Sequence, residues 1–273
     1  MTGMTGITLE TELSAEQFGE ISRTVYDVAG IRLRPGKEGL VRSRLARRLR
    51  ALGAGSYGEY LARVRADATG RELAEMVDAL TTNKTSFFRE PAHFDYLRER
   101  VLPALPAREP LRMWSAGCST GEEPYSLAMV LRESLPDLAR RDVRLLATDI
   151  SSRVLAPARA GRYADAAVAD VPPELLRRHF LRAGDAWEVA PAVRSLVTFA
   201  RLNLMAAWPM RGPFEAIFCR NVMIYFDKPT QQELVARYYE LLAPGGHLFV
   251  GHSESLSGIA HRFTYVQPAV YRR

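Results

Sequence analysis

Hydrophobic residues recur every three to four positions through the first eighty residues, which is the spacing of amphipathic helices. The pattern predicts helices at 15–29, 37–52 and 59–66, and a further helix that follows Gly70 and ends at Leu80. Ser14 and Gln17 resemble a capping box before the first helix, and Gly30 ends it. We therefore expect a small, wholly helical N-terminal region.

The rest of the chain alternates short apolar runs with helical segments. The predicted strands are 111–116, 143–148, 196–202, 214–219, 247–251 and 265–271, the last confined by Pro268 to an edge or bulged position. Predicted helices lie at 93–101, 151–160, 173–180 and 227–242, and a small hairpin element is expected within 161–195. Strands that alternate with helices predict an α/β domain with a mostly parallel, doubly wound sheet.

A glycine turn follows the first predicted strand. Gly117 and Gly121 lie four residues apart, and Glu122 and Glu123 follow directly, at the start of a helical pattern. In an α/β sheet such a turn lies at the carboxyl end of a strand, where ligands bind. An ordinary strand-to-helix connection has the same pattern, so the turn alone leaves both interpretations open.

Asp149 ends the second predicted strand, 28 residues after Gly121. An acidic residue at this strand tip holds ribose hydroxyls in nucleoside-binding sheets. The same residue would also serve as the N-cap of the helix that follows. Its pairing with the glycine turn favours the ribose interpretation.

Composition narrows the class of protein. Of 273 residues, 47% are hydrophobic and 25% charged, as in soluble globular proteins, and no apolar run approaches the roughly 20 residues of a membrane span. The first residues lack the pattern of a signal peptide, so we expect a cytoplasmic protein without membrane insertion. Cys118, Cys219 and five scattered histidines lack metal-ligand spacing, so no metal site is predicted.

Positive charge is concentrated in one N-terminal segment. Only Glu38 and Glu59 oppose ten basic residues there: Arg32, Arg34, Lys37, Arg42, Arg44, Arg47, Arg48, Arg50, Arg63 and Arg65. A helix that is merely solvated mixes both signs, so the segment predicts a binding surface for an acidic partner. Charge alone fits nucleic acid and an acidic protein surface equally, although no aromatic or glycine-rich nucleic-acid motif accompanies the arginines.

Five motifs together resemble the chemotaxis receptor methyltransferases, the CheR family. They are TTNKTSFFRE, WSAGCSTGEEPYSLAM, ATDISSRVL, FEAIFCRNVMIYFDK and LAPGGHLFVGHSESL. The resemblance implies an enzyme that uses S-adenosylmethionine to methylate glutamate side chains on the cytoplasmic helices of chemoreceptors. It further implies a helical domain at 1–80 and a linker at 81–92 that contributes to the cofactor site. A class I methyltransferase domain would follow at 93–273, with a β-subdomain at about 161–195.

The resemblance also implies site residues. Those expected to bind cofactor are Asn83, Thr85, Arg89, Gly117, Glu122 or Glu123, Asp149, Asn203, Leu204, Arg220 and Asn221. Arg89 and Tyr225 are expected at the reacting groups, although Tyr225 fits a half-buried aromatic at a strand end almost as well. The arginine-rich helix, with Arg42, Arg44, Arg47, Arg48 and Arg50, matches the family's receptor-docking helix, without a nucleic-acid partner.

The chemistry of the acceptor suits this set of residues. A glutamate carboxylate has a reference pKa of about 4.3 and is ionised at neutral pH, so no general base is required. We expect Arg89 to hold the acceptor carboxylate, because guanidinium pairs with carboxylate in a fixed fork.

Two rival functions remain open on the sequence. One is a nicotinamide-dependent oxidoreductase, which would require G-x-G-x-x-G in place of Gly-Cys-Ser-Thr-Gly, and the other is a catalytically silent binding module.

One departure from the family pattern concerns the β-subdomain. Many relatives carry a longer, glycine-containing loop there, which grips a peptide at the receptor's C-terminus. The corresponding stretch here, residues 182–187, is shorter by a few residues. We therefore expect this enzyme to dock directly on the receptor bundle, without a C-terminal pentapeptide tether.

Overall fold

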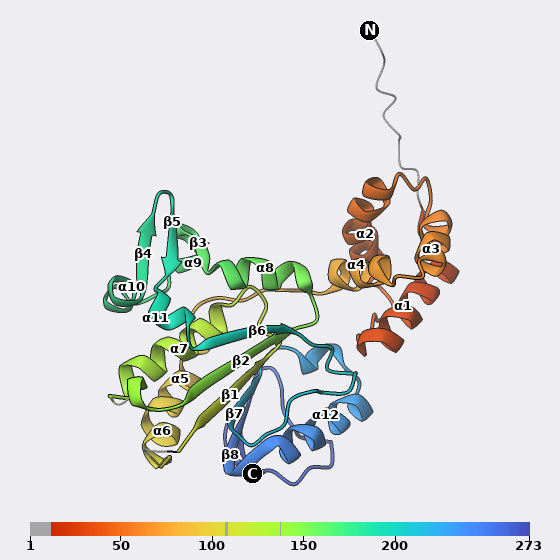
Figure 1. Ribbon diagram of the computed structural model, residues 1–273. Coiled ribbons are helices and arrows are strands. Elements are labelled where there is room, and N and C mark those ends of the chain that lie inside the picture. Colours follow the sequence, from red (N-terminus) through yellow and green to blue (C-terminus); the bar gives the residue numbers. More distant parts are fainter. Residues whose placement is uncertain (1–11, 107–108, 137) are drawn as a thin grey trace. The chain divides into compact units, whose positions relative to one another are not determined.

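The structure, a computed structural model, describes residues 12–106, 109–136 and 138–273 (Figure 1). Residues 1–11, which underlie the prediction about a signal peptide, lie outside that part of the chain. The chain divides into two compact units, one ending at Thr82 and one beginning at Asn83. Within the described residues, no helix has both the length and the apolar character needed to cross a bilayer.

The first unit is helical, as its hydrophobic spacing predicts. Helix α2 (Glu38–Leu52) turns one apolar stripe inward: Val41, Leu45 and Leu49 are fully buried, and Leu52 is half-buried. Ser14 and Gln17 form the predicted capping box, and Gly30 ends the first helix with a φ of 69°. The described helices are α1 (Ala15–Ala29), α2 (Glu38–Leu52), α3 (Tyr57–Ala66) and α4 (Arg71–Leu80).

The second unit is built on a seven-stranded sheet in the order β6-β2-β1-β7-β8-β10-β9. The first five strands in this order pair in parallel, and β10 and β9 pair antiparallel at one edge. The strands are β1 (Leu111–Ala116), β2 (Val143–Asp149), β6 (Val197–Arg201), β7 (Phe214–Cys219), β8 (Leu242–Val250), β9 (Thr264–Gln267) and β10 (Val270–Arg272). The predicted mostly parallel, doubly wound sheet is confirmed.

Helices cover both faces of this sheet. Met113 packs in one cluster with Leu127 and Leu97. The neighbouring Trp114 points to the other face, where its ring centroid lies 5.5 Å from that of Tyr238. Figure 1 shows α5, α6 and α7 on one side of the strands and α12 on the other. The helical segments are α5 (Ala92–Tyr96), a π-helical stretch (Leu97–Val101), α6 (Leu102–Ala104), α7 (Glu122–Ser134), a 3-10 turn (Leu138–Arg140), α8 (Ser152–Ala160), a 3-10 turn (Met223–Tyr225) and α12 (Lys228–Leu241).

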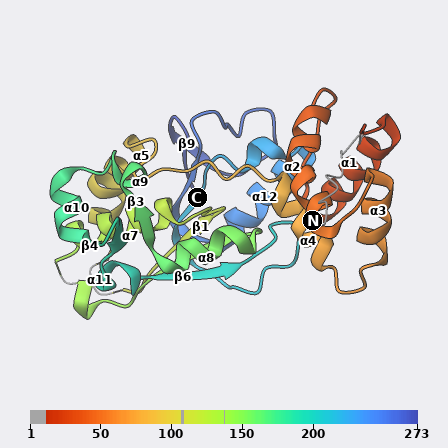
Figure 2. The same cartoon turned by 90° about the horizontal axis from the view of Figure 1, so that it is seen from above.

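The predicted hairpin element is a separate three-stranded sheet in the order β3-β5-β4. Phe87 packs edge-on against Tyr163 and Phe180 in the core of this element. Figure 2 shows the element beside α7. Its parts are β3 (Arg162–Ala164), α9 (Asp165–Val168), α10 (Pro173–His179), β4 (Phe180–Ala183), β5 (Ala186–Val189) and α11 (Pro191–Arg194).

Several predicted boundaries differ from the structure by one or two residues, such as the helix expected at 59–66, which begins at Tyr57, and three differ more, for identifiable reasons. The expected single strand at 265–271 is two antiparallel strands, because Pro268 and Ala269, with a φ of 63°, form a turn between them. β8 begins at Leu242 rather than at 247, since Leu242 pairs with Phe214 across a register shift. The helix expected at 93–101 runs on to Ala104, because the π-helical stretch is followed directly by α6; Pro103, in α6, has no N–H to donate to a preceding turn.

Candidate active site

The glycine turn lies at the carboxyl end of β1, as predicted. Gly117 and Gly121 have φ angles of 94° and 99°, and a side chain at Gly117 would place its Cβ 2.3 Å from Val222 Cγ2. The N–H groups of Gly117 and Cys118 both donate to the carbonyl of Thr148, at 2.8 and 2.9 Å. The turn is therefore fixed against the end of β2, in a conformation that only glycine adopts at low cost.

Asp149 ends β2 and is buried beneath this turn. Its Oδ2 accepts from Ser119 N at 2.8 Å, and its Oδ1 accepts from Ser151 N at 2.9 Å. The N-cap of α8 is Ser151, whose hydroxyl accepts from Val154 N. The alternative interpretation of Asp149 as that N-cap is therefore wrong.

The loop after β6 is joined to the same end of the sheet. Leu202 N donates to the carbonyl of Asp149 at 2.9 Å, which places Asn203 and Leu204 beside the end of β2. The carbonyl of Leu204 accepts from Trp208 Nε1 at 3.2 Å and from Arg237 Nη1, on α12, at 2.7 Å. Both expected loop residues therefore lie near Asp149.

Residues 83–90, which we call the strap, belong to the same unit as the sheet. The carbonyl of Asn83 accepts from Ser119 Oγ at 3.0 Å, and Phe88 N donates to Ser126 Oγ, also at 3.0 Å. The strap therefore crosses the glycine turn and the start of α7. It carries three of the expected residues, Asn83, Thr85 and Arg89.

The backbone of the strap is strained where it meets the sheet. Phe88 and Glu90 have φ angles of 50° and 58°, in the left-handed region that disfavours side chains with a Cβ. Arg89 is half-buried as a residue, and its guanidinium donates to the carbonyl of Lys84 at 2.9 Å. Strain of this kind persists only where surrounding contacts impose it, and the bonds of the strap to Ser126 on α7 and to Arg220 after β7 supply them.

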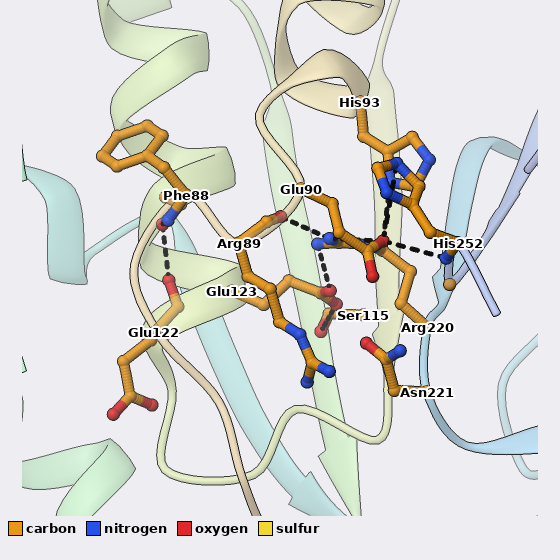
Figure 3. A network of polar contacts seen from close by, with 12 residues as sticks. Phe88, Arg89, Glu90, His93, Ser115, Glu122, Glu123, Arg220, Asn221 and His252 are labelled. Atoms are coloured by element: carbon orange, nitrogen blue, oxygen red, sulfur yellow. Dashed lines mark hydrogen bonds and ion pairs between the residues drawn. The ribbon is translucent and has the colours of Figure 1, made fainter. Parts of the chain in front are cut away.

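A buried charge cluster joins the strap to β7 and α7 (Figure 3). Arg220, which follows β7, has a side chain only 2% exposed; its Nη1 lies 2.9 Å from Glu123 Oε2 and its Nη2 lies 3.0 Å from Glu90 Oε2. Nη2 also donates to the carbonyl of Arg89, and Ser115 Oγ donates to Glu123 at 2.7 Å. Burial disfavours the charge on Glu90, but Arg220 outweighs it and lowers the pKa of that carboxyl.

This cluster separates the roles of the two adjacent glutamates. Glu123 is committed to Arg220 and Ser115, whereas Glu122 accepts from Thr120 Oγ1 at 2.7 Å. Figure 3 shows the Glu122 carboxylate pointing away from the cluster. Burial raises the pKa of Glu122, and the Thr120 hydroxyl opposes that shift.

The segment after β7 carries Asn221, with a φ of 58°, and the half-buried Tyr225 on a 3-10 turn. The buried Glu254 holds this segment by its backbone: Oε2 accepts from Asn221 N at 2.7 Å and from Gly251 N at 2.6 Å, and Oε1 accepts from Ile224 N at 3.1 Å. Burial raises the pKa of Glu254, against these donors. No feature of the sequence indicates the link between Glu254 and the segment that carries Tyr225.

Glu90, His93 and His252 form a second unexpected group. Although the histidines are scattered in sequence, one ligand-type atom from each residue lies within 4.8 Å of the others. Burial lowers the pKa of His93 to about 3, with Arg220 contributing in the same direction. Sequence spacing could not reveal this group, because its members meet only where the strap reaches the end of β8.

The arginine-rich helix α2 presents only part of its charge. Arg48 pairs with Glu72 at 2.5 Å and with Glu75 at 3.1 Å, both on α4. Arg44 donates to the carbonyls of residues 80 and 81 and to Thr82 Oγ1. Few acidic residues lie near these arginines in the sequence. Arg48 nevertheless has two acidic partners, and both lie on α4. The exposed ones are Arg42, Arg47 and Arg50.

Comparison with known proteins covers both units. Residues 83–271 match the family described as CheR methyltransferase, SAM binding domain, and residues 16–81 match the CheR methyltransferase all-alpha domain. The chain belongs to the CheR methyltransferase family. It is therefore a methyltransferase that uses S-adenosylmethionine, and the resemblance drawn from the five motifs is confirmed.

Curated relatives are similar over nearly their whole lengths. A probable chemotaxis protein methyltransferase of Rhizobium etli is 44% identical over 91% of this chain and 96% of its own. The chemotaxis protein methyltransferase of Escherichia coli is 43% identical over 95% of this chain and 91% of its own length. A solved S-adenosylmethionine dependent methyltransferase from Mesorhizobium loti matches 54% of this chain and 48% of its own, with 18% identity and a TM-score of 0.30.

Proposed function

We propose that this CheR family member methylates glutamate carboxylates on the cytoplasmic helices of chemoreceptors. Family membership supports the transfer reaction, and the relatives' name, chemotaxis protein methyltransferase, supports the receptor as substrate. The structural observation that carries the proposal is the position of the strap, which brings Arg89 to the end of the sheet where the glycine turn and Asp149 lie. Such an enzyme would act in the cytoplasm, where those receptor helices are.

The residues at this end of the sheet fit the cofactor by their chemistry. The carboxylate of Glu122 suits the cationic amino acid moiety of the cofactor, and that of Asp149 suits its ribose hydroxyls. The loop at Asn203 and Leu204 suits its nucleobase. The strap residues Asn83 and Thr85, together with Gly117 and Asn221, complete the proposed cofactor set. S-adenosylmethionine would supply the methyl group from its sulfonium, and the sulfur that loses this group becomes the uncharged thioether of S-adenosylhomocysteine.

Of the two candidate glutamates, we propose Glu122 as the one that contacts the cofactor. Both oxygens of Glu123 already hold buried partners, Ser115 on one and Arg220 on the other, whereas the Glu122 carboxylate accepts one bond, from Thr120. Arg220 accordingly acts as a positioning residue that fixes the strap through the carbonyl of Arg89 and the carboxylate of Glu90. This assignment differs from direct cofactor binding by Arg220, which the family resemblance implies.

Arg89 and Tyr225 are proposed to orient the acceptor. The carboxylate is already ionised, so these residues need only align an oxygen with the methyl carbon; well-oriented reactions gain roughly 7–11 kcal/mol in favourable cases. The Arg89 guanidinium has one bond within the strap, to the carbonyl of Lys84, which leaves further N–H groups for a carboxylate. Too tight a pairing would stabilise the ground state, since charge is neutralised as the ester forms.

Receptor docking is proposed for the exposed part of the arginine-rich helix. Arg42, Arg47 and Arg50 are exposed, whereas Arg44 and Arg48 bind within their own unit. We propose a corresponding division of labour in which residues 1–80 dock, 81–92 complete the cofactor site and 93–273 perform transfer.

The β-subdomain supports docking without a peptide tether. β4 and β5 are joined by Gly184 and Asp185 alone, with Gly184 at a φ of 66°, so the connection is a tight hairpin turn. Such a turn lacks the extended loop with which many relatives grip a receptor's C-terminal peptide. Calorimetry with a C-terminal receptor pentapeptide should show no measurable binding, and clear affinity would contradict this part of the proposal.

Transfer of a labelled methyl group tests the proposed function directly. The protein is incubated with labelled S-adenosylmethionine and receptor-containing membranes, and base-labile label in glutamate is the expected product. Membranes in which the receptor glutamates are replaced by alanine provide the control. Label in any other residue, or equal label in the control membranes, would overturn the assignment of the acceptor.

A further inference from the structure

His93 on α5 is the least satisfied buried polar residue near the charge cluster. Its side chain is 1% exposed, and neither Nδ1 nor Nε2 has a hydrogen-bond partner among the described residues. A buried imidazole without any partner loses its hydration without compensation. Such a group calls for a physical explanation, and an ion is one of the few available.

Two other ligand-type side chains face this ring. Glu90 Oε2 lies 3.6 Å from His93 Nδ1 and 4.0 Å from His252 Nε2, and the two imidazole rings have centroids 5.0 Å apart. His252 is about half exposed, which gives the group an opening to solvent. Figure 3 shows Glu90 and the two histidines converging from the strap, α5 and the segment after β8.

The geometry points to a binding site for a divalent transition-metal ion, with Glu90, His93 and His252 as its ligands. Two imidazoles and one carboxylate are a donor set that Zn²⁺ accepts, with a fourth position left to water. Tetrahedral ligands at the usual bond lengths lie about 3.3–3.5 Å apart. The 3.6 Å between Glu90 Oε2 and His93 Nδ1 already lies close to that range, and rotation of the exposed His252 side chain would shorten its 4.0 Å separation from Glu90.

Arg220 determines how this site relates to the proposed catalytic one. Its guanidinium and the N–H of His252 already donate to Glu90 Oε2, so an ion must compete for that oxygen. The second carboxylate of the cluster, Glu123, partly offsets the positive charge of Arg220, which reduces the repulsion that the ion experiences. Because Arg220 also holds the carbonyl of Arg89, ion binding is expected to loosen the strap and slow methyl transfer.

The binding test uses the full-length protein, freed of metals by a chelator, and needs neither cofactor nor receptor. Titration with Zn²⁺ is followed by calorimetry, and Co²⁺ is added separately to record the visible absorption of tetrahedral coordination. We expect one ion per chain, with affinity reduced more than about tenfold in His252→Ala. The matched control is His261→Ala, an exposed histidine outside the group, which should bind as the wild type does.

Several results would overturn this inference. They are equal binding by wild type and His252→Ala, loss of binding in His261→Ala, or absence of a tetrahedral cobalt spectrum. A crystal grown with Zn²⁺ that shows only a water at His93 Nδ1 would have the same effect. Because binding is measured without methyl transfer, failure of the proposed function would leave this result intact, and failure of this site would leave the proposed function intact.

Discussion

Arginine is used in opposite ways in the two units of the molecule. Arg220 lies almost wholly out of water between Glu90 and Glu123, with 2% of its side chain exposed, whereas Arg47 on α2 is exposed. A buried guanidinium is costly to desolvate and is retained where several partners satisfy it. An exposed one contributes little to folding and remains available to a partner. The same residue type therefore fixes the site in one unit and offers a binding surface in the other.

Removing the buried arginine should give the largest effect. Arg220→Ala leaves Glu90 and Glu123 buried without their cation, so we expect a loss of about 3–5 kcal/mol in the free energy of unfolding. Urea denaturation followed by circular dichroism measures it. The matched variant Arg47→Ala should change the free energy by less than about 0.5 kcal/mol. Similar losses in the two variants would contradict the contrast between the arginines.

The next effect concerns the arginine proposed to hold the acceptor. Arg89→Ala should slow methyl transfer on the order of 10²-fold, because misplacement of a reacting group by about 1 Å costs that much. The rate of labelled methyl incorporation at saturating cofactor measures it. Arg47→Ala should instead weaken receptor binding, more strongly at low salt than at high salt. Equal loss in both variants without any salt effect would contradict the division of labour.

Glu254 tests whether the turn that carries Tyr225 is held through its backbone. Glu254→Gln replaces one acceptor oxygen by an N–H₂ group that faces main-chain donors, so we expect a loss of about 1–3 kcal/mol in the free energy of unfolding. If the turn positions Tyr225, the rate of transfer at saturating substrate should fall more than cofactor affinity does. A variant that loses only stability would limit Glu254 to support of the fold.

The smallest effect lies within the arginine-rich helix itself. Arg48→Ala removes the ion pairs to Glu72 and Glu75 on α4, so we expect about 1–2 kcal/mol of destabilisation and little change in receptor affinity. Arg42→Ala should show the reverse, with a weaker receptor complex and unchanged stability. Thermal unfolding and receptor sedimentation distinguish the two. A loss of receptor affinity in Arg48→Ala alone would reassign the docking surface.

Hydrophobic spacing determined most of the fold. Helices α1, α2 and α4 and strands β1, β2 and β7 lie where the sequence predicts them, because each buries a periodic or continuous apolar set. Boundaries that depend on a partner strand were not predictable. Leu242 extends β8 only because Phe214 lies beside it, and residues 268–269 turn because β10 pairs with β8.

The candidate site divides in the same manner. The sequence by itself placed Gly117, Asp149 and the loop at Asn203 at the carboxyl ends of strands, since strand order along the chain and glycine's backbone freedom are local properties. Only the tertiary structure decided that Glu123 is committed to Arg220, that Glu254 holds the segment of Tyr225, and that Glu90 meets His93 and His252. Burial and charge pairing depend on residues far apart in the sequence: 97 positions separate Glu123 from Arg220, and 162 separate Glu90 from His252. No local pattern of residues encodes that proximity.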